Sequence, residues 1–420
     1  MEHSTLLFTL ACSFGFFMAW GVGANDVANG MGIAVGSKSL TLRQAVGMAV
    51  IFEFLGAMTV GGQVTDTIRG GIINAASVDG MPELLILGML SSLLATGIWL
   101  IIASYFSCPV STTHTLVGAI IGFALIRLGA DAVYWHNITN IALSWVLTPA
   151  IACGIAYSLF RSVQYFVLNA PDPVDAAKKF VPVYLFIAAL VITMVTFTRG
   201  LAHLGWHFSF TKNLLCASTM SLIITAVGTW MLHRLHLTPR RNPRFDFQNV
   251  ESIFSILMIF TGCAMAFAHG SNDVANAIGP LAAIVNILAS HGEMAEASAA
   301  EIPFWVMTLG AVGIVAGLLM YGYKIIATVG TEITDFTPSR GFAATLATAS
   351  TVVVASGTGL PISTTQTLVG AILGVGLARG IAALRIEVLR NIFLSWLITL
   401  PVGALLSIII FYVLEAFLGK

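Results

Sequence analysis

Two short polar segments stand out in this chain, because each carries one carboxylate between two carboxamides in an apolar setting. Residues 23–30 read Gly-Ala-Asn-Asp-Val-Ala-Asn-Gly, and residues 270–277 read Gly-Ser-Asn-Asp-Val-Ala-Asn-Ala. A charged side chain inside a bilayer costs about 2.5–3.5 kcal/mol on insertion scales, so an intramembrane Asp indicates a functional site. The chain carries this cost twice, which points to a polar path shared by two related segments.

The chemistry of the two segments favours a hard cation. Carboxylate and carboxamide oxygens are the ligands that such cations prefer. If each segment is helical, its two Asn side chains share one face and its Asp lies about 100° round the axis. The alternative is that the Asn side chains only join helices together, but an unpaired buried Asp would stabilise such a contact poorly. The candidate ligands are Asn25, Asp26, Asn29, Asn272, Asp273 and Asn276.

A second repeated motif predicts an anion site. Residues 109–113 read Pro-Val-Ser-Thr-Thr and residues 361–365 read Pro-Ile-Ser-Thr-Thr. Proline suits the first turn of a helix and Ser or Thr caps it well. Each motif therefore predicts a helix start, whose free N–H groups and positive dipole end attract anions. We expect the two starts to meet on one tetrahedral oxyanion. The hydroxyls concerned are those of Ser111, Thr112, Thr113, Ser363, Thr364 and Thr365.

The alternative for these hydroxyls is that they bond only to helix backbone or to a neighbouring helix. The repetition of the whole triplet after a proline disfavours that alternative. His114 follows the first triplet and Gln366 follows the second, so a hydrogen-bonding role fits both positions and a metal role fits neither.

Two further ionisable residues lie in apolar surroundings. Glu53 has no acidic counterpart in the second half, and two interpretations stay open: cation coordination or proton relay, and a structural acid paired with another group. We include Glu53 among the candidate cation ligands. His269 directly precedes the second polar segment and has no twin in the first, so its role also stays open.

The composition around these motifs is that of a polytopic membrane protein. The 420 residues are 57% hydrophobic and 9% charged, whereas an average soluble protein is about 25% charged. Formal net charge is zero, which gives no indication of nucleic-acid binding. The five cysteines are widely spaced and predict neither a zinc site nor a disulfide framework. Apolar runs of about 20 residues, enough to cross a bilayer, occur at 84–106, 138–159, 181–197, 214–232, 304–326 and 391–417.

The motifs recur in the same order, which indicates an internal duplication. Residues 109–122 match residues 361–374 at 11 of 14 positions. We therefore expect a first transmembrane repeat over 1–165 and a second over 251–420. The central segment, 166–250, is predicted to hold two transmembrane spans and a basic loop that faces the cytoplasm by the positive-inside rule.

Duplicated halves with polar, Gly- or Pro-broken segments at matched places are typical of secondary transporters with a site at the membrane midplane. Hydropathy alone does not fix whether the halves insert parallel or inverted. The sequence contains no His-Glu-x-x-His, Gly-x-Ser-x-Gly or Walker-type loop, so it gives no indication of an enzyme or of a nucleotide-driven pump.

At these motifs the chain closely resembles the inorganic phosphate transporter (PiT) family, which also includes related sulfate permeases. The resemblance rests on the paired Asn-Asp-Val-Ala-Asn and Pro-x-Ser-Thr-Thr motifs and spans essentially the full length. It implies an all-α membrane protein, with the two halves as an inverted repeat and re-entrant helical hairpins at the substrate site. It also implies a homodimer. Because the chain lacks a long hydrophilic central insertion, it resembles a compact prokaryotic form, expected in the inner (plasma) membrane.

Carried over residue by residue, the resemblance implies roles for the motif positions. Asn25, Asp26, Asn272 and Asp273 resemble ligands of both ions and phosphate, and the two hydroxyl triplets resemble phosphate ligands at hairpin tips. The expected function is symport of phosphate with sodium ions, with no other cofactor. The alternatives are proton coupling and a sulfate permease of the same fold. Moving one charge against 100 mV costs about 2.3 kcal/mol, so import of an anion needs accompanying cations.

Overall fold

The computed structural model describes residues 4–74, 78, 81–106, 110–201, 208–237, 246–323, 326, 336–380 and 386–418. Within these ranges nine helices are long and apolar enough to cross a bilayer, which agrees with the expected all-α polytopic architecture. The helices of the first half are α1 (Ser4–Asn25), α2 (Ala28–Gly36), α3 (Leu42–Gly70), α4 (Pro82–Tyr105), α5 (Thr112–Arg127), η2 (Ala130–Ala132), α6 (Trp135–Val163) and η3 (Gln164–Leu168). The remaining helices are α7 (Pro173–Thr198), α8 (Phe210–Arg234), α9 (Phe247–Ala289), α10 (Met294–Ala299), α11 (Phe304–Gly317), η6 (Leu318–Gly322), α13 (Pro338–Gly357), α14 (Thr364–Arg379) and α15 (Ile386–Leu418).

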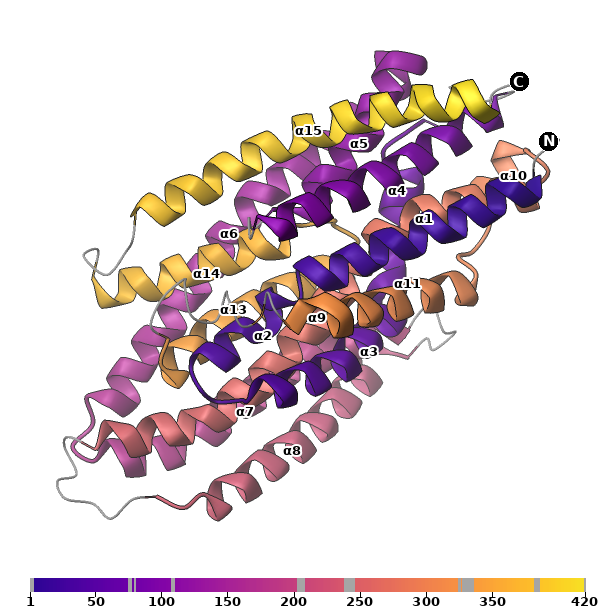
Figure 1. The fold of residues 1–420 in the computed structure, drawn as a ribbon. Coiled ribbons are helices and arrows are strands. Elements are labelled where there is room, and N and C mark those ends of the chain that lie inside the picture. Colours follow the sequence, from indigo (N-terminus) through magenta and orange to yellow (C-terminus); the bar gives the residue numbers. More distant parts are fainter. Residues whose placement is uncertain are drawn as a thin grey trace.

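The helices run along one common direction, so the molecule has two ends. Both termini lie at one end, together with α10, whereas α8 ends and α9 begins at the other (Figure 1). At the end with the termini, Arg127 at the end of α5 pairs with Glu415 near the end of α15. At the opposite end, Glu251 of α9 accepts hydrogen bonds from the backbone and hydroxyl of Ser339, at 2.8 and 2.7 Å, where α13 begins.

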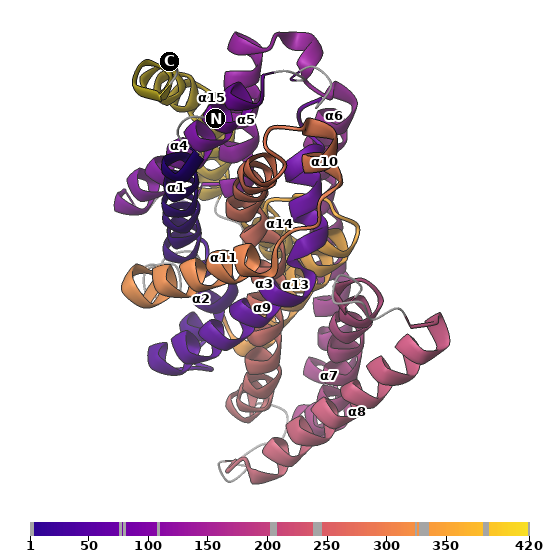
Figure 2. The same cartoon turned by 90° about the vertical axis from the view of Figure 1, so that its right-hand side faces the viewer.

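Helices α7 and α8 lie to one side of the bundle, with α8 outermost (Figure 2). In the chain, these two helices lie between the two halves, within the predicted central segment. The domain boundaries at 165/166 and 250/251 stay a prediction. The basic cluster expected in the cytoplasm falls largely at 238–245, outside the described residues. Its first members, His233 and Arg234, lie in the last turn of α8, at the end opposite the termini.

In the C-terminal part of each half, helices of the two halves pack against each other. Helix α5 packs on α15, and α14 packs on α6. Glycines allow the close approach, because a Cβ at Gly118 would lie 2.3 Å from the carbonyl oxygen of Leu400, and a Cβ at Gly370 would lie 2.3 Å from that of Pro149. Helix α5 runs from the interior toward the end with the termini, and α14 runs from the interior toward the other end (Figure 1). The two motif-bearing helices thus start side by side and diverge.

Candidate functional site

The repeated Ser-Thr-Thr motifs begin two helices in the interior, as the sequence predicts. Ser111 is the N-cap of α5 and its hydroxyl accepts from the backbone N–H of His114 at 3.3 Å. Ser363 caps α14 in the same way, accepting from the N–H of Gln366 at 3.3 Å. Pro109 lies outside the described residues. The predicted helix starts are therefore confirmed in both halves, and both caps are buried.

The two Asn-Asp motifs differ in backbone structure. The second lies within the continuous helix α9, where the expected helical face holds. The first spans an interruption, because α1 ends at Asn25 and α2 begins only at Ala28. There the N–H of Asn29 bonds to the carbonyl of Asp26 at 2.9 Å, three residues back instead of four. The prediction of one regular helical face is wrong for the first motif, because the chain forms a turn with a three-residue hydrogen bond at Asp26.

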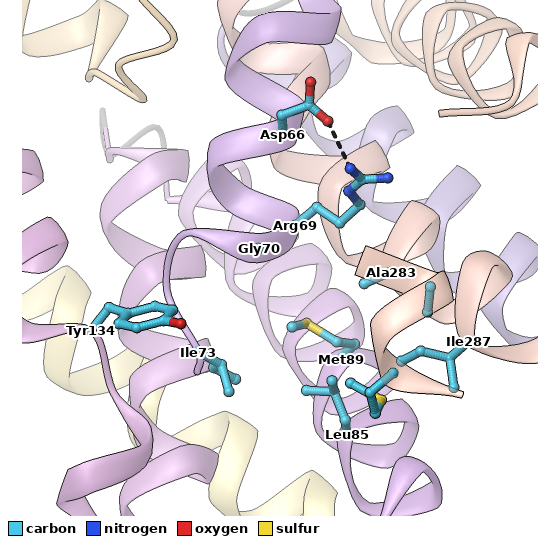
Figure 3. A pocket seen from close by; sticks show the side chains of 11 residues that line it. Asp66, Arg69, Gly70, Ile73, Leu85, Met89, Tyr134, Ala283 and Ile287 are labelled. Carbon is cyan, nitrogen blue, oxygen red and sulfur yellow. Dashed lines mark ion pairs between the residues drawn. The ribbon is translucent and has the colours of Figure 1, made fainter. Parts of the chain in front are cut away.

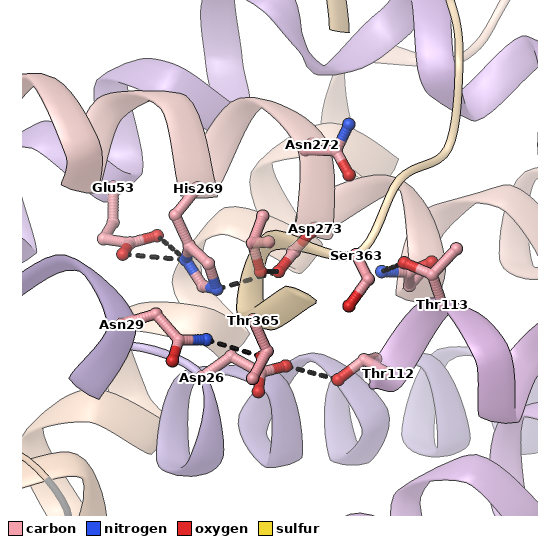
Figure 4. Close-up of polar contacts among 12 residues, drawn as sticks. Asp26, Asn29, Glu53, Thr112, Thr113, His269, Asn272, Asp273, Ser363 and Thr365 are labelled. Carbon is pink, nitrogen blue, oxygen red and sulfur yellow. Dashed lines mark hydrogen bonds and ion pairs between the residues drawn. The ribbon is translucent and has the colours of Figure 1, made fainter. Parts of the chain in front are cut away.

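Each aspartate binds the middle threonine of its own half. The hydroxyl of Thr112 donates to Asp26 Oδ2. The hydroxyl of Thr364 donates to Asp273 Oδ2 at 2.8 Å. All four side chains are at most 3% exposed, so these carboxylates obtain hydrogen bonds from hydroxyl donors. The cation motif and the anion motif, read separately in the sequence, are thereby brought into one site (Figure 4).

The outer asparagine of each motif reaches across to the other half. Nδ2 of Asn29 donates to Oγ1 of Thr365 at 2.8 Å, and Nδ2 of Asn276 donates to Oγ1 of Thr113 at 3.3 Å. The hydroxyl of Thr113 in turn donates to the carbonyl of Ile362 at 2.8 Å. Both halves therefore contribute polar side chains to one centre, in a pattern that repeats when the halves are exchanged.

The first asparagine of each motif binds a serine that sequence reasoning missed. Nδ2 of Asn25 donates to Oγ of Ser104 at 2.6 Å, and the amide of Asn272 lies 3.1 Å from Oγ of Ser356. Each serine stands five residues before the proline of its own Pro-x-Ser-Thr-Thr motif. That matched spacing was a usable signal, because it gives the two serines corresponding places in the duplicated halves.

Glu53 is paired with His269, a contact that the sequence left open. Nδ1 of His269 lies 2.8 Å from both carboxylate oxygens of Glu53, and its Nε2 lies 2.9 Å from Oδ2 of Asp273. All three side chains are buried. Figure 4 shows the imidazole between the two acids. Because Glu53 contacts His269 and His269 contacts Asp273 among the described residues, this geometry favours the paired-acid interpretation over direct cation coordination.

This ion pair breaks the symmetry between the halves. A Cβ at Gly270 would lie 2.2 Å from the carbonyl oxygen of Glu53, and a Cβ at Gly23 would lie 1.9 Å from that of Ile314. Glu53 and Ile314 therefore occupy matching places against matching glycines. The residues that precede the two glycines are His269 and Val22. A buried Glu–His pair thus stands beside the second Asn-Asp motif, where two apolar side chains stand beside the first.

Comparison with known proteins identifies the chain. The sequence profile of the phosphate transporter family matches residues 22–407. The chain belongs to the phosphate transporter family. It is 51% identical to a Haemophilus influenzae protein named "Putative phosphate permease", over 99% of this chain and 98% of that protein. It is 42% identical to the chloroplastic inorganic phosphate transporter 2-1 of Arabidopsis thaliana, over 97% of this chain and 71% of that protein.

A solved structure supports the same assignment. A structure titled "The sodium-dependent phosphate transporter" matches 98% of this chain and 100% of its own, with a TM-score of 0.90 and 36% sequence identity. Members of this family are transporters, not enzymes. A phosphate transporter whose described residues include nine helices long and apolar enough to cross a bilayer is a multi-pass membrane protein, as the composition predicts.

The residues at the centre of this phosphate transporter include a group that could hold a cation. Asp26, Asp273 and Glu53 bring three carboxylates and His269 one imidazole, and one ligand atom each of Asp26, His269 and Asp273 lies within 4.8 Å of the others. Both ring nitrogens of His269 already contact carboxylates, which leaves mainly oxygen ligands. The buried Oδ1 of Asn276 has no hydrogen-bond partner within the described residues. A set of mainly carboxylate and carboxamide oxygens fits a hard cation such as sodium and disfavours a transition metal.

Proposed function

We propose that this phosphate transporter is a secondary active symporter that imports inorganic phosphate together with sodium ions by alternating access. We further propose that it acts in the inner (plasma) membrane as a homodimer, with its two halves arranged as an inverted repeat. The observation that carries the proposal is the pair of matched contacts in which Thr112 binds Asp26 and Thr364 binds Asp273. Acidic cation ligands and hydroxyl anion ligands then share one centre.

Coupling follows from the order in which charges are compensated. A phosphate anion placed among Asp26 and Asp273 would be repelled while both are ionised and unpaired, and the low dielectric of the interior strengthens that repulsion. Sodium ions at the two aspartates remove it, with Asn25, Asn29, Asn272 and Asn276 as further oxygen ligands. Phosphate then binds at the hydroxyls and free N–H groups of the two helix starts. The empty transporter, and the transporter with sodium and phosphate both bound, are therefore favoured over the transporter with phosphate alone.

Glu53 and His269 act in this proposal as positioning residues. The imidazole, held by Glu53, contacts Asp273, whereas Val22 stands at the matching place before the first motif. It therefore orients the second carboxylate and leaves its remaining oxygen directed toward the cation. The two cation positions are then chemically unequal, although the surrounding motifs are repeated.

In this proposal, alternating access depends on the hydrogen bonds that cross between the two halves. The hydrogen bond from the Asn29 amide to Thr365 and the one from the Asn276 amide to Thr113 both cross from one half to the other. A rotation of one half against the other changes both crossing contacts together while each aspartate keeps the threonine of its own half. Because phosphate and sodium neutralise the centre jointly, we expect this rotation to need both ligands or neither.

Uptake of radiolabelled phosphate into proteoliposomes tests the proposal. We expect accumulation driven by an inward sodium gradient, unaffected by sulfate in excess. Uptake that follows only a pH gradient would replace sodium by protons at the aspartates. Accumulation of sulfate in place of phosphate would contradict the assignment of substrate. Phosphate can donate a hydrogen bond to a buried carboxylate and sulfate cannot, which is the chemical basis for discrimination.

A further inference from the structure

The two serines that bind the first asparagines of the motifs have matching contacts on their own helices. The hydroxyl of Ser104 donates to the carbonyl oxygen of Leu100 at 2.7 Å, and that of Ser356 donates to the carbonyl oxygen of Val352 at 2.9 Å. A hydroxyl has one hydrogen and two lone pairs. Because that hydrogen is used within the helix, each serine presents a lone pair to its asparagine, and the amide nitrogen turns toward it.

Ser356 thereby sets the orientation of the Asn272 side chain. Nδ2 of Asn272 lies 3.1 Å from Oγ of Ser356 and 3.3 Å from the carbonyl oxygen of Leu360, so both acceptors lie on one side of the amide. The amide oxygen therefore points the opposite way. Figure 4 shows it on the side of Asp273 and Ser363, with the nitrogen on the far side.

The amide oxygen of Asn272 meets two further oxygens on that side. It lies 3.1 Å from the carbonyl oxygen of Ile362 and 3.1 Å from Oδ1 of Asp273. The other oxygen of Asp273, Oδ2, is engaged by Thr364 and His269. Three oxygens, one of them anionic, repel one another at this spacing, and a hard cation between them replaces the repulsion by attraction.

The opposite orientation of the Asn272 amide suits the protein without a cation. Its nitrogen would then donate to the Ile362 carbonyl and to Asp273 Oδ1, both at 3.1 Å, and its oxygen would accept from the Ser356 hydroxyl at 3.1 Å. Ser356 would have to give up its bond to Val352, since it has one hydrogen. Ser356 thus keeps its bonds to both Asn272 and Val352 when the amide oxygen faces Asp273, and only one of the two when the nitrogen does.

We infer that Ser356 is a positioning residue for sodium, which favours the orientation of Asn272 that presents its amide oxygen to the ion together with the Ile362 carbonyl and Asp273 Oδ1. The inference rests on the proposed function for the identity of the ion. It adds a side chain that does not touch sodium and a backbone ligand, Ile362. Loss of the Ser356 hydroxyl removes the advantage of one hydrogen bond, so sodium has to compete with an amide nitrogen that turns more often toward Asp273.

This oxygen cluster is separate from the cavity of about 280 Å³ at the end of the molecule that holds the termini (Figure 3). On α9, the cavity-lining Ala283 follows Asn272 by eleven residues, or about 16 Å along the helix. Tyr134, which also lines the cavity, donates its hydroxyl to Oδ1 of Asn74 at 3.0 Å. Tyr134→Phe therefore removes a hydrogen-bonding hydroxyl far from the sodium ligands, and it serves as one control.

The sodium dependence of phosphate uptake into proteoliposomes tests the inference. We expect Ser356→Ala to raise the KM for sodium by about 3- to 10-fold, the size of one neutral hydrogen bond. It should keep kcat, and the KM for phosphate at saturating sodium. Ser158→Ala is the matched control, because the hydroxyl of this exposed serine of α6 also bonds the carbonyl four residues back, that of Gly154. Ser158→Ala and Tyr134→Phe should both transport as wild type does.

A second measurement reports on the amide orientation without transport. The rise of the thermal unfolding midpoint with sodium concentration gives the apparent sodium affinity of the full chain in detergent. Asn272→Asp places an oxygen on both sides of the group, so its orientation no longer matters. Adding Ser356→Ala to Asn272→Asp should therefore leave the apparent sodium affinity unchanged, whereas Ser356→Ala alone should lower it.

The outcomes separate this inference from the proposed function. Wild-type uptake without any sodium dependence contradicts both. Sodium-dependent wild-type uptake with an unchanged sodium KM in Ser356→Ala overturns the inference alone. An equal loss of sodium affinity when Ser356→Ala is added to Asn272→Asp also overturns it, because Ser356 then supports the site without orienting the amide.

Discussion

Asn29 binds Thr365 across 336 residues of sequence, with 2.8 Å between Nδ2 and Oγ1. The contact joins the first Asn-Asp motif to the hydroxyl triplet of the other half, and the contact of Asn276 with Thr113 repeats it in the opposite sense. Local contacts would let each half close its own site independently. Because crossing contacts bring side chains of each half to the motif of the other, we expect the conformations of the two halves to be coupled.

A double-mutant cycle on the first crossing contact measures this coupling. A neutral hydrogen bond contributes about 0.5–1.5 kcal/mol, so Asn29→Ala and Thr365→Val should show an interaction energy of that size in the apparent affinity for phosphate. The measurement is the KM of uptake for wild type, both single variants and the double variant. A cycle of Asn29→Ala with Thr139→Val, an exposed threonine of α6, should be additive. Additivity in both cycles would contradict the coupling.

Removing the charge of either central aspartate should abolish sodium-driven uptake. Asp26→Asn and Asp273→Asn keep the size of the side chain and remove the anion that holds the cation. We expect uptake to fall to the background of empty liposomes, with unchanged size-exclusion profiles. Asp131→Asn, an exposed aspartate of η2, should transport as wild type does. Sodium-driven uptake at the wild-type rate by Asp26→Asn and Asp273→Asn would show that neither carboxylate binds the coupling ion.

The middle threonines should be sensitive to loss of the hydroxyl and tolerant of loss of the methyl group. A hydrogen bond to a charged partner contributes about 1.5–3 kcal/mol, so Thr112→Val or Thr364→Val should lower kcat/KM for phosphate by roughly 10- to 100-fold. Thr112→Ser and Thr364→Ser keep the donor and should lose far less. The ratio between the Val and Ser variants in initial-rate uptake is the measurement. Equal losses would point to packing as the role of these residues.

Removing one member of the buried Glu53–His269 pair should destabilise the protein, whereas replacing both members with apolar residues should change its stability little. Removing one partner of a buried pair costs about 3–5 kcal/mol, whereas replacing both by apolar groups is often neutral. Ile314 and Val22 already occupy the matching places beside the first Asn-Asp motif. Glu53→Ile and His269→Val should therefore each lower thermal stability, and the double variant should recover most of it. Uptake should stay impaired in the double variant, because Asp273 has lost its positioning group.

The contradicting outcomes for this pair are distinct. A double variant as unstable as the sum of the singles would show that the two side chains do not act as a unit. A double variant that is stable and transports normally would remove the positioning role and leave a purely structural pair.

The parts of the site that sequence reasoning found are those that the duplication repeats. The Asn-Asp motifs and the hydroxyl triplets each occur twice with the same spacing, so their polar residues stand out against apolar surroundings. The repetition does not determine which hydroxyl triplet contacts which Asn-Asp motif. The structure shows that Asp26 binds within its half and Asn29 across it, a choice made by how the two halves pack.

The residues that break the repetition were the ones left open. Glu53 and His269 lie 216 positions apart, and nothing in their local sequence links them. Their pairing follows from the packing of α3 on α9. The helix interruption at Asp26 could not be predicted from the motif itself. Both motifs have nearly the same sequence, but only the first is interrupted, between α1 and α2.

Close helix contact between the halves should make Gly374 intolerant of a single methyl group. A Cβ at this position would lie 2.1 Å from the carbonyl oxygen of Cys153 on α6, far inside contact distance with backbone that cannot rotate away. Overpacking of this kind costs about 1–3 kcal/mol or more, so Gly374→Ala should lower the thermal unfolding midpoint. Gly154→Ala is the matched control, since a Cβ there meets nothing within 4 Å and alanine favours helix by about 1 kcal/mol. Fluorescence-detected unfolding of both variants should give shifts of opposite sign, and a Gly374→Ala midpoint equal to wild type would contradict the tight α6–α14 contact.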